Sequence, residues 1–211
     1  MGFNYAEIGD RKFYNFIRKP CKTLIKLFIK IECEGKENIP GKGAFIIACN
    51  HIHFIDPVLL LCECNRPIHF MAKVEAFKNK LAAFFLTNLN VFPVSRGRSD
   101  KTSIDYAVDL IKTGHVIGIF PEGTRSKDLK PHEAKAGVAL IARQTKADIL
   151  PASVYCEKKG GLFRKVTVRF GELIKYDELG ITEDGSTREL REAAKKIMDE
   201  IVDLWEEGHC D

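Results

Sequence analysis

The sequence has no long hydrophobic run, no internal repeat and no low-complexity segment. No uninterrupted apolar stretch approaches the roughly 18 residues that a membrane-spanning helix needs, so we expect no helical membrane domain. There is no Gly-x-Ser-x-Gly sequence, which argues against the nucleophile turn of a serine hydrolase. No secretory signal pattern is visible, and this absence predicts a reducing, cytoplasmic setting.

Cysteine occurs without the pairing that a disulfide framework or a zinc site requires. The seven cysteines are odd in number and scattered, and several fall in apolar patterns that are typical of buried free thiols. Cys62 and Cys64 resemble half of a metal site, but no second pair at ligand spacing accompanies them. We therefore predict packing roles for the cysteines and no metal or other cofactor.

Length and composition indicate one soluble globular domain with a short appendage. The chain has 211 residues, 45% of them hydrophobic and 29% charged, with a net charge of +4. This small net charge does not identify a partner, and we expect no nucleic acid. The basic residues between positions 11 and 30 are unaccompanied by acidic ones: Arg11, Lys12, Arg18, Lys19, Lys22, Lys26 and Lys30.

Residues 1–35 are predicted to form an amphipathic membrane-surface arm. Residues 11–31 divide at Pro20 into two short helical pieces, and Lys22, Lys26 and Lys30 recur every four residues as one stripe. Such a segment can lie among anionic phospholipid headgroups with its lysines directed at phosphates, as a peripheral or monotopic contact with the cytoplasmic face of the membrane. The alternative is a helix that packs on its own domain with a solvated basic face.

Residues 36–211 alternate between strand and helix patterns. Such alternation predicts an α/β layered domain with a mostly parallel or mixed central sheet flanked by helices. The expected strands are 44–48, 68–72, 91–94, 116–120, 149–154 and 165–170, and the expected helices are 57–64, 74–86, 99–113, 132–144 and a last one opened by a capping box at Ser186.

The stretch from Cys49 to Pro57 holds a histidine and a carboxylate five positions apart, His51 and Asp56. On a continuous helix this spacing is about 500° of rotation, which separates the side chains. Pro57 suits the first position of a helix with Asp56 as its N-cap, so the preceding residues can form a tight turn that folds the carboxylate onto the imidazole. The alternative is that Asp56 only caps the helix and His51 only stabilises the loop.

Chemically active residue types follow four of the predicted strands. His51 follows the first, Lys73 the second, Arg96 the third and the run 122–125 the fourth. Ligands in open α/β sheets gather at the carboxyl ends of strands, so we expect these residues to share one site.

These residues resemble the motifs of the glycerolipid acyltransferases, the family typified by 1-acyl-sn-glycerol-3-phosphate acyltransferase. Asn50 to Asp56 is similar to the family's NHX4D block, and residues 120–126 (FPEGTRS) match its third block. The stretches 91–96 and 149–154 resemble the second and fourth blocks, so the resemblance spans roughly residues 36–175. Where the family often has glycine before the second block, this chain has Asn90, which also tolerates a left-handed backbone.

The resemblance implies transfer of a fatty acyl group from acyl-CoA or acyl-carrier protein to the hydroxyl of lysophosphatidate, giving phosphatidate. His51 would be the general base and Asp56 would orient it. Backbone amides near His51, or Lys73, would stabilise the oxyanion. The phosphate would be held by Arg96, Gly123, Thr124 and Arg125, with Glu122 orienting an arginine or binding a glycerol hydroxyl.

Several alternatives remain open from the residues. The acceptor could be glycerol-3-phosphate or another lysophospholipid, and water as acceptor would make the chain a hydrolase. His51 and His53 could hold a metal, although no third ligand is evident. Glu122 and Arg125 could pair and merely brace their loop. A non-enzymatic lipid-binding domain is the alternative from a different class.

Overall fold

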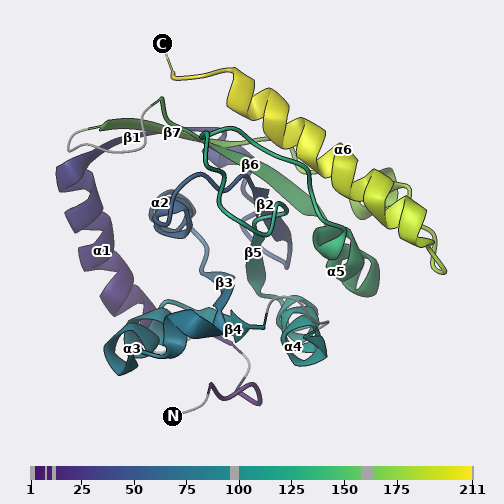
Figure 1. The fold of residues 1–211 in the computed structure, drawn as a ribbon, viewed down its shortest axis with the longest axis horizontal. Coiled ribbons are helices and arrows are strands. Elements are labelled where there is room, and N and C mark those ends of the chain that lie inside the picture. Colours follow the sequence, from purple (N-terminus) through teal and green to yellow (C-terminus); the bar gives the residue numbers. More distant parts are fainter. Residues whose placement is uncertain (1–2, 8, 11–12, 96–99, 158–163, 211) are drawn as a thin grey trace.

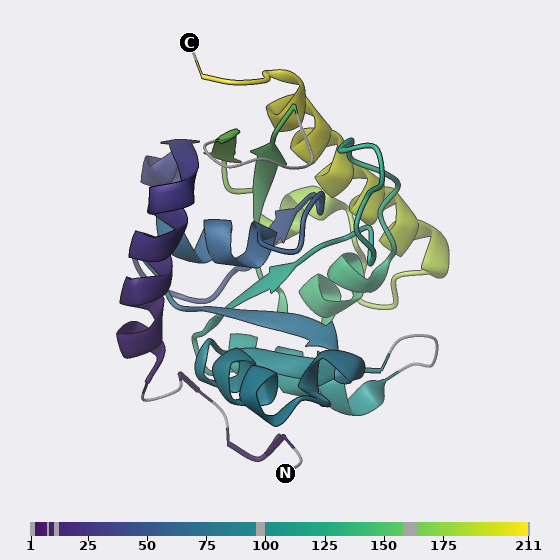
Figure 2. The ribbon, with the colours of Figure 1, turned by 60° about the vertical axis from the view of Figure 1, so that its left-hand side comes forward.

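The computed structural model describes residues 3–7, 9–10, 13–95, 100–157 and 164–210, and within them seven strands form one mixed sheet (Figures 1 and 2). The strand order is β1-β7-β6-β2-β5-β3-β4. Strands β6, β2, β5, β3 and β4 are mutually parallel, whereas β7 runs antiparallel to β6 and parallel to β1. The strands are β1 (Ile29–Glu34), β2 (Ile46–Cys49), β3 (Ile68–Lys73), β4 (Val91–Val94), β5 (Val116–Ile119), β6 (Ile149–Tyr155) and β7 (Arg164–Phe170).

Helices cover both faces of the sheet, so the predicted layered α/β fold is confirmed (Figure 1). One face packs against α1 (Tyr14–Phe28), α2 (Asp56–Glu63) and α3 (Lys80–Asn88). The other packs against α4 (Lys101–Lys112), α5 (Gly137–Thr145) and α6 (Thr187–Glu206). Short 3-10 helices occupy Lys36–Asn38, Val74–Phe77 and Tyr176–Leu179. Among the described residues, no helix is long and apolar enough to cross a membrane.

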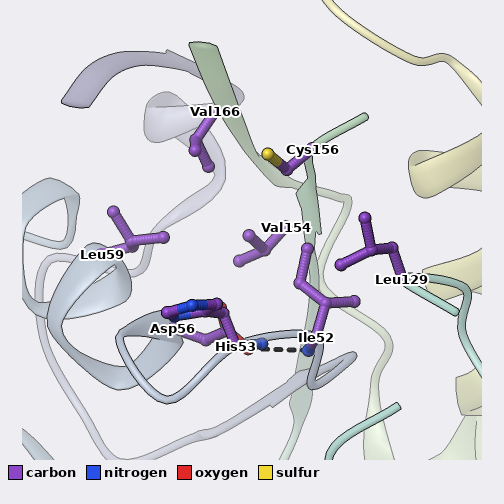
Figure 3. Close-up of a pocket in the computed structure, with 8 residues that line it drawn as sticks. All are labelled: Ile52, His53, Asp56, Leu59, Leu129, Val154, Cys156 and Val166. Atoms are coloured by element: carbon purple, nitrogen blue, oxygen red, sulfur yellow. Dashed lines mark hydrogen bonds between the residues drawn. The ribbon is translucent and has the colours of Figure 1, made fainter. Parts of the chain in front are cut away.

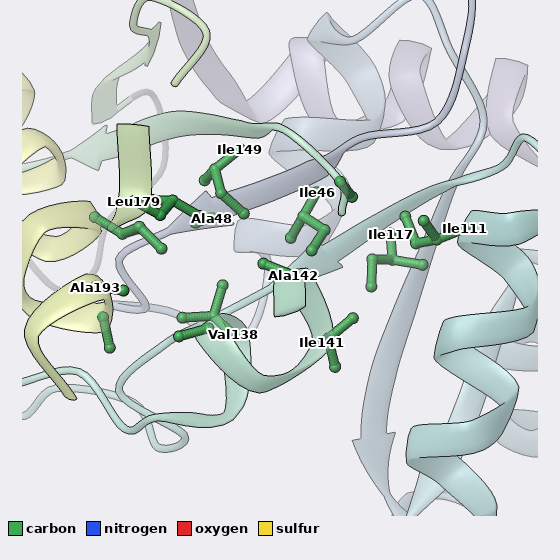
Figure 4. Close-up of a cluster of buried hydrophobic side chains, with 14 of the residues drawn as sticks. Ile46, Ala48, Ile111, Ile117, Val138, Ile141, Ala142, Ile149, Leu179 and Ala193 are labelled. Carbon is green, nitrogen blue, oxygen red and sulfur yellow. The ribbon is translucent and has the colours of Figure 1, made fainter. Parts of the chain in front are cut away.

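The central strand β2 is buried on both sides because its side chains alternate between two apolar cores. Ile46 and Ala48 face the core under α4, α5 and α6 (Figure 4), whereas Ile47 and Cys49 face the core under α2. A parallel strand covered on both faces has no solvent-facing side chains, which explains its continuous apolar run. Packing against both cores fixes the position of β2, and His51 follows directly after this strand.

The N-terminal helix and the first strand differ from the prediction. A single helix, α1, continues through Pro20, which removes only one backbone donor from the ladder. Residues Ile29–Glu34, placed in the helical arm by the sequence, instead form edge strand β1 beside β7. Their strict alternation of apolar and charged side chains is the strand signal that the prediction missed.

Two of the three lysines of the predicted stripe, Lys22 and Lys26, lie on α1 and point at α2. Lys22 Nζ donates to Cys62 O at 2.7 Å, and Lys26 Nζ lies 3.1 Å from the buried carboxylate of Glu63. Arg18 donates to Leu61 O at 2.9 Å. These cations meet the unsatisfied carbonyls at the end of α2, where positive charge is favourable. Lys22 and Lys26 therefore attach α1 to its own domain, whereas Lys30 lies on β1 and pairs with Glu32 of the same strand.

Smaller differences concern helix ends. The predicted helix 74–86 is a 3-10 turn followed by α3, because Asn79 accepts hydrogen bonds from the amides of Leu81 and Ala82 and starts a new helix. Helix α5 begins at Gly137, later than predicted. The capping box at Ser186 and the left-handed backbone of Asn90, with φ of 60°, are confirmed.

Candidate active site

The turn between β2 and α2 brings His51 and Asp56 together. His51 Nδ1 lies 2.8 Å from Asp56 Oδ2, as the predicted fold-back of the carboxylate requires. The helix begins one residue earlier than expected: Asp56 is its first residue and Ile55 its N-cap. The carboxylate therefore bonds the turn that precedes it and does not cap its own helix.

Asp56 is fully buried and its Oδ2 accepts three hydrogen bonds. Besides His51 Nδ1, the amides of Ile52 and His53 donate to it at 2.8 and 2.7 Å. In the described part of the chain, Oδ1 has no partner. Because a carboxylate accepts, the Nδ1 of His51 carries the proton in this bond and Nε2 keeps its lone pair. This is the tautomer that a general base needs.

A stack of aromatic rings sets the plane of the His51 imidazole. His51 stacks on Phe120 at a centroid distance of 4.1 Å, and Phe120 in turn stacks on Phe70 at 6.0 Å. Gly118 makes room for this stack, because a Cβ there would lie 2.2 Å from the Phe70 ring. The imidazole remains 13% exposed, which leaves its outer edge accessible.

The loop after β5 holds the backbone of His51 at two points. Glu122 Oε1 accepts from His51 N at 2.8 Å, and Ser126 N donates to His51 O at 2.7 Å. Burial raises the pKa of Glu122 to about 7, against the lowering effect of this hydrogen bond. Glu122 thus contacts the backbone of His51, a role that the sequence did not predict.

Asn50 fixes the end of β2 beside β6. Its Nδ2 donates to Val154 O at 3.0 Å, and its Oδ1 accepts from Val154 N at 2.8 Å. The side chain thereby continues the sheet ladder by one pair after the backbone has turned away.

The structure describes all but one of the remaining predicted site residues. Gly123 adopts a left-handed backbone with φ of 70°, and the side chains of Thr124 and Arg125 that follow are exposed. Lys73 is exposed at the carboxyl end of β3, on the same edge of the sheet. Arg96 lies outside the described residues.

A basic residue outside the predicted site residues, Lys135, lies against this loop. Lys135 donates its amide to Pro121 O at 2.9 Å. A Cβ built on Gly123 would lie 3.1 Å from Lys135 Nζ, so the ammonium group covers the glycine. No motif marks Lys135, because its contact with Gly123 depends on how residues 127–135 fold back.

Two earlier suggestions lose support. The amides of residues 51–53 donate to Glu122 and Asp56, so they are not available to an oxyanion, which leaves Lys73 of the two suggested donors. The only group of three potential metal ligands within the described chain does not include His51 or His53.

A small cavity borders this turn (Figure 3). It is lined by Ile52, His53, Asp56, Leu59, Leu129, Val154, Cys156 and Val166. Apart from His53 and Asp56, these side chains are apolar or weakly polar. At about 10 Å³ the cavity has room for about one water, so an acyl chain could enter it only if the lining side chains moved.

Comparison with known proteins identifies the class to which this fold and site belong. The family model described as Acyltransferase matches residues 30–155. A 1-acyl-sn-glycerol-3-phosphate acyltransferase of Bacillus subtilis (strain 168) is 36% identical over 154 residues, covering 72% of this chain and 76% of the relative. The chain therefore belongs to the acyltransferase family.

Other relatives carry the same enzyme name. A 1-acyl-sn-glycerol-3-phosphate acyltransferase of Streptococcus pneumoniae (strain ATCC BAA-255 / R6) is 26% identical over 94% of this chain and 75% of its own. The crystal structure of the 1-acyl-sn-glycerophosphate acyltransferase PlsC from Thermotoga maritima superposes with a TM-score of 0.69 at 28% identity, covering 91% of this chain and 80% of that one. The predicted family and enzyme type, an acyltransferase of the 1-acylglycerol-3-phosphate O-acyltransferase type, are confirmed.

Proposed function

We propose that this enzyme transfers a fatty acyl group from an acyl thioester, carried by CoA or acyl-carrier protein, to the free hydroxyl of 1-acyl-sn-glycerol-3-phosphate, giving phosphatidate for phospholipid synthesis. The observation that carries the proposal is the bond of 2.8 Å between His51 Nδ1 and the buried carboxylate of Asp56. The names of the matched relatives support the choice of acceptor.

The chemistry follows from the tautomer of His51. Its Nε2 takes the proton of the acceptor hydroxyl while the hydroxyl oxygen attacks the thioester carbonyl. The tetrahedral intermediate collapses, the carbon–sulfur bond breaks and the imidazolium returns the proton to the departing thiolate. Asp56 stabilises the imidazolium throughout, as the carboxylate of a catalytic triad does. Lys73 is the predicted donor to the oxyanion.

The acceptor phosphate is assigned to the cations of the loop after β5, together with Arg96. Arg125 offers a planar fork of donors, and Lys135 adds an ammonium beside Gly123. Arg125→Ala should raise the KM for lysophosphatidate by about 100-fold and Lys135→Ala by about 10-fold, with much smaller changes in kcat. Arg125→Lys, the matched control, should recover part of the loss, because it restores the charge without the fork.

A panel of acceptors and donors tests the reaction itself. We expect consumption of the thioester with lysophosphatidate and little with water. Turnover with glycerol-3-phosphate or a phosphate-free lysolipid, but not with lysophosphatidate, would overturn the acceptor. Comparing acyl-CoA with acyl-carrier protein in the same assay identifies the donor.

The proposed membrane contact rests on exposed apolar side chains. Helices α1 and α3 touch each other, and the catalytic turn carries Phe54. The large apolar side chains exposed on these segments are Phe13 (the N-cap of α1), Phe16, Leu24, Leu27, Phe28, Phe54, Leu81, Phe84 and Phe85. Side chains of this kind insert among headgroups and acyl chains at a bilayer surface.

Vesicle sedimentation can distinguish a membrane contact made by these apolar side chains from one made by the lysines of α1. Phe16→Ser with Leu27→Ser should reduce binding to anionic vesicles at unchanged charge. Lys22→Ala is the control, because Lys22 contacts Cys62; it should weaken the attachment of α1 and leave vesicle binding largely intact. A larger loss of vesicle binding in Lys22→Ala than in the double serine variant would show that the lysines make the membrane contact.

A further inference from the structure

Three potential metal-ligating side chains meet at the edge of the sheet opposite His51. Asp10 precedes α1, His69 is the second residue of β3, and His115 immediately precedes β5. Their ligand atoms all lie within 4.8 Å of one another, and Asp10 Oδ1 is 3.0 Å from His69 Nε2. Strands β3 and β5 are parallel neighbours, so both histidines lie at the amino ends of strands.

Hydrogen bonds already orient two of the three side chains. Thr113 Oγ1 lies 3.0 Å from His115 Nδ1, which turns the other ring nitrogen away from α4. That nitrogen faces the segment before Asp10, because a Cβ on Gly9 would lie 3.5 Å from His115 Nε2. Asn90 Nδ2 donates to Asp10 Oδ1 at 3.1 Å. Metal sites commonly hold their ligands through outer contacts of this kind.

The donor set selects the class of ion. Two imidazole nitrogens with one carboxylate suit zinc and similar divalent transition ions, whereas magnesium and calcium prefer oxygen donors throughout. Tetrahedral bonds of about 2.0–2.1 Å place neighbouring donors about 3.3 Å apart. His69 is buried in the sheet, but Asp10 and His115 lie on connecting segments that could close this gap.

We propose that Asp10, His69 and His115 form a binding site for a divalent transition ion of the zinc class, with water completing the tetrahedron. The site is structural. It holds the segment before α1, which is otherwise attached by hydrogen bonds from Tyr5 to Pro93 O and from Tyr106 to Glu7 O. It does not depend on the acyl transfer proposed above, because its ligands lie on the opposite edge from His51.

The test is metal titration of the full chain after removal of metals by chelation. We expect one Zn²⁺ or Co²⁺ per chain, with a tetrahedral Co²⁺ spectrum that lacks a thiolate charge-transfer band. An ion at about 100 times its Kd should raise Tm by roughly 5–10 °C. His115→Ala removes one ligand and keeps the bond between Asp10 and His69. It should weaken binding at least about 10-fold and abolish the metal-dependent rise in Tm.

His132→Ala is the matched control. This exposed imidazole also pairs with an aspartate, at 2.9 Å from Asp128, so the substitution removes an equivalent ring elsewhere on the surface. It should leave the affinity unchanged. The proposal is overturned if no stoichiometric ion binds, if a thiolate band shows that cysteines hold the cobalt, or if binding is lost in His132→Ala or His53→Ala and kept in His115→Ala.

Discussion

Two pairs of histidine and aspartate lie at opposite edges of the same sheet. The bond is 2.8 Å between His51 and Asp56 and 3.0 Å between His69 and Asp10. In the first pair the carboxylate is fully buried and the imidazole is 13% exposed; in the second the imidazole is 2% exposed and the carboxylate 43%. The first pair therefore exposes part of its ring, and the second exposes its carboxylate.

The ring nitrogen used in each pair completes the contrast. Asp56 bonds Nδ1 of His51 and leaves Nε2 at the accessible edge, whereas Asp10 bonds Nε2 of His69. A short histidine–aspartate distance is thus common to both, and exposure with orientation decides which can take a proton from a substrate. The following predictions test that distinction, beginning with the largest expected effect.

Replacing the base should have the largest effect. His51→Ala should lower kcat by about 100- to 10,000-fold while lysophosphatidate binding persists, because the imidazole is used mainly in the chemical step. Asp56→Asn should cause a loss of similar order, since an amide can donate to Nδ1 and favour the wrong tautomer. Steady-state assays with acyl thioester and lysophosphatidate measure both.

The double variant provides the control. Residues that act as one unit are non-additive, so His51→Ala with Asp56→Asn should be no worse than His51→Ala alone. Losses that multiply would show that Asp56 acts independently of the imidazole, and wild-type turnover in His51→Ala would contradict the general-base role.

The sequence predicted one pair and not the other, for a physical reason. His51 and Asp56 are five residues apart, so a single tight turn before the helix that contains Pro57 is enough to bring them together. His69 meets Asp10 only after 58 intervening residues have formed α1, β1, β2 and α2. The α/β layering and most elements follow from periodicity, which is local. Tertiary packing determines the remaining features: the direction of the lysine stripe, the contact of Lys135 with Gly123 and the position of β1.

Truncating His69 should destabilise the fold more than truncating His51, the reverse of their expected effects on activity. His69 is buried, so His69→Ala should lower the free energy of unfolding by about 2–4 kcal/mol through the cavity and the lost bond to Asp10. His51→Ala should lower the free energy of unfolding by less, because the His51 ring is partly exposed. Urea unfolding of both variants, after chelation of metals, measures the difference. Equal losses would show that burial does not distinguish the pairs.

His51 stacks on Phe120, whereas His69 meets His115 edge-on at 5.4 Å. Gly118→Ala should disturb the stack, because the added Cβ would overlap the Phe70 ring and displace Phe120 from His51. Overpacking of this kind costs about 1–3 kcal/mol, and kcat should fall with the loss of ring orientation. Gly137→Ala is the control, since nothing lies within 4 Å of its Cβ, and it should retain stability and turnover.

The two edges also move carboxyl pKa values in opposite directions, and this predicts the smallest effect. The hydrogen bond from His69 lowers the pKa of Asp10, whereas burial raises the pKa of Glu122 from 4.5 to about 7. From about pH 5.5 to 7 the unfolded chain has mostly lost the Glu122 proton and the native chain still binds it. Raising the pH over this range should therefore lower the free energy of unfolding by about 1.5 kcal/mol.

Glu122→Gln isolates this contribution from the other titrating groups. The glutamine carbonyl can still accept from His51 N, but it binds no proton, so the variant should lack this part of the pH dependence. The difference between wild type and variant, measured by urea unfolding at each pH, should thus fall as the pH rises. A constant difference would mean that Glu122 is already ionised in the native protein. The backbone of His51 would then be held by a full negative charge, and the catalytic edge would resemble the Asp10 edge more closely than its burial implies.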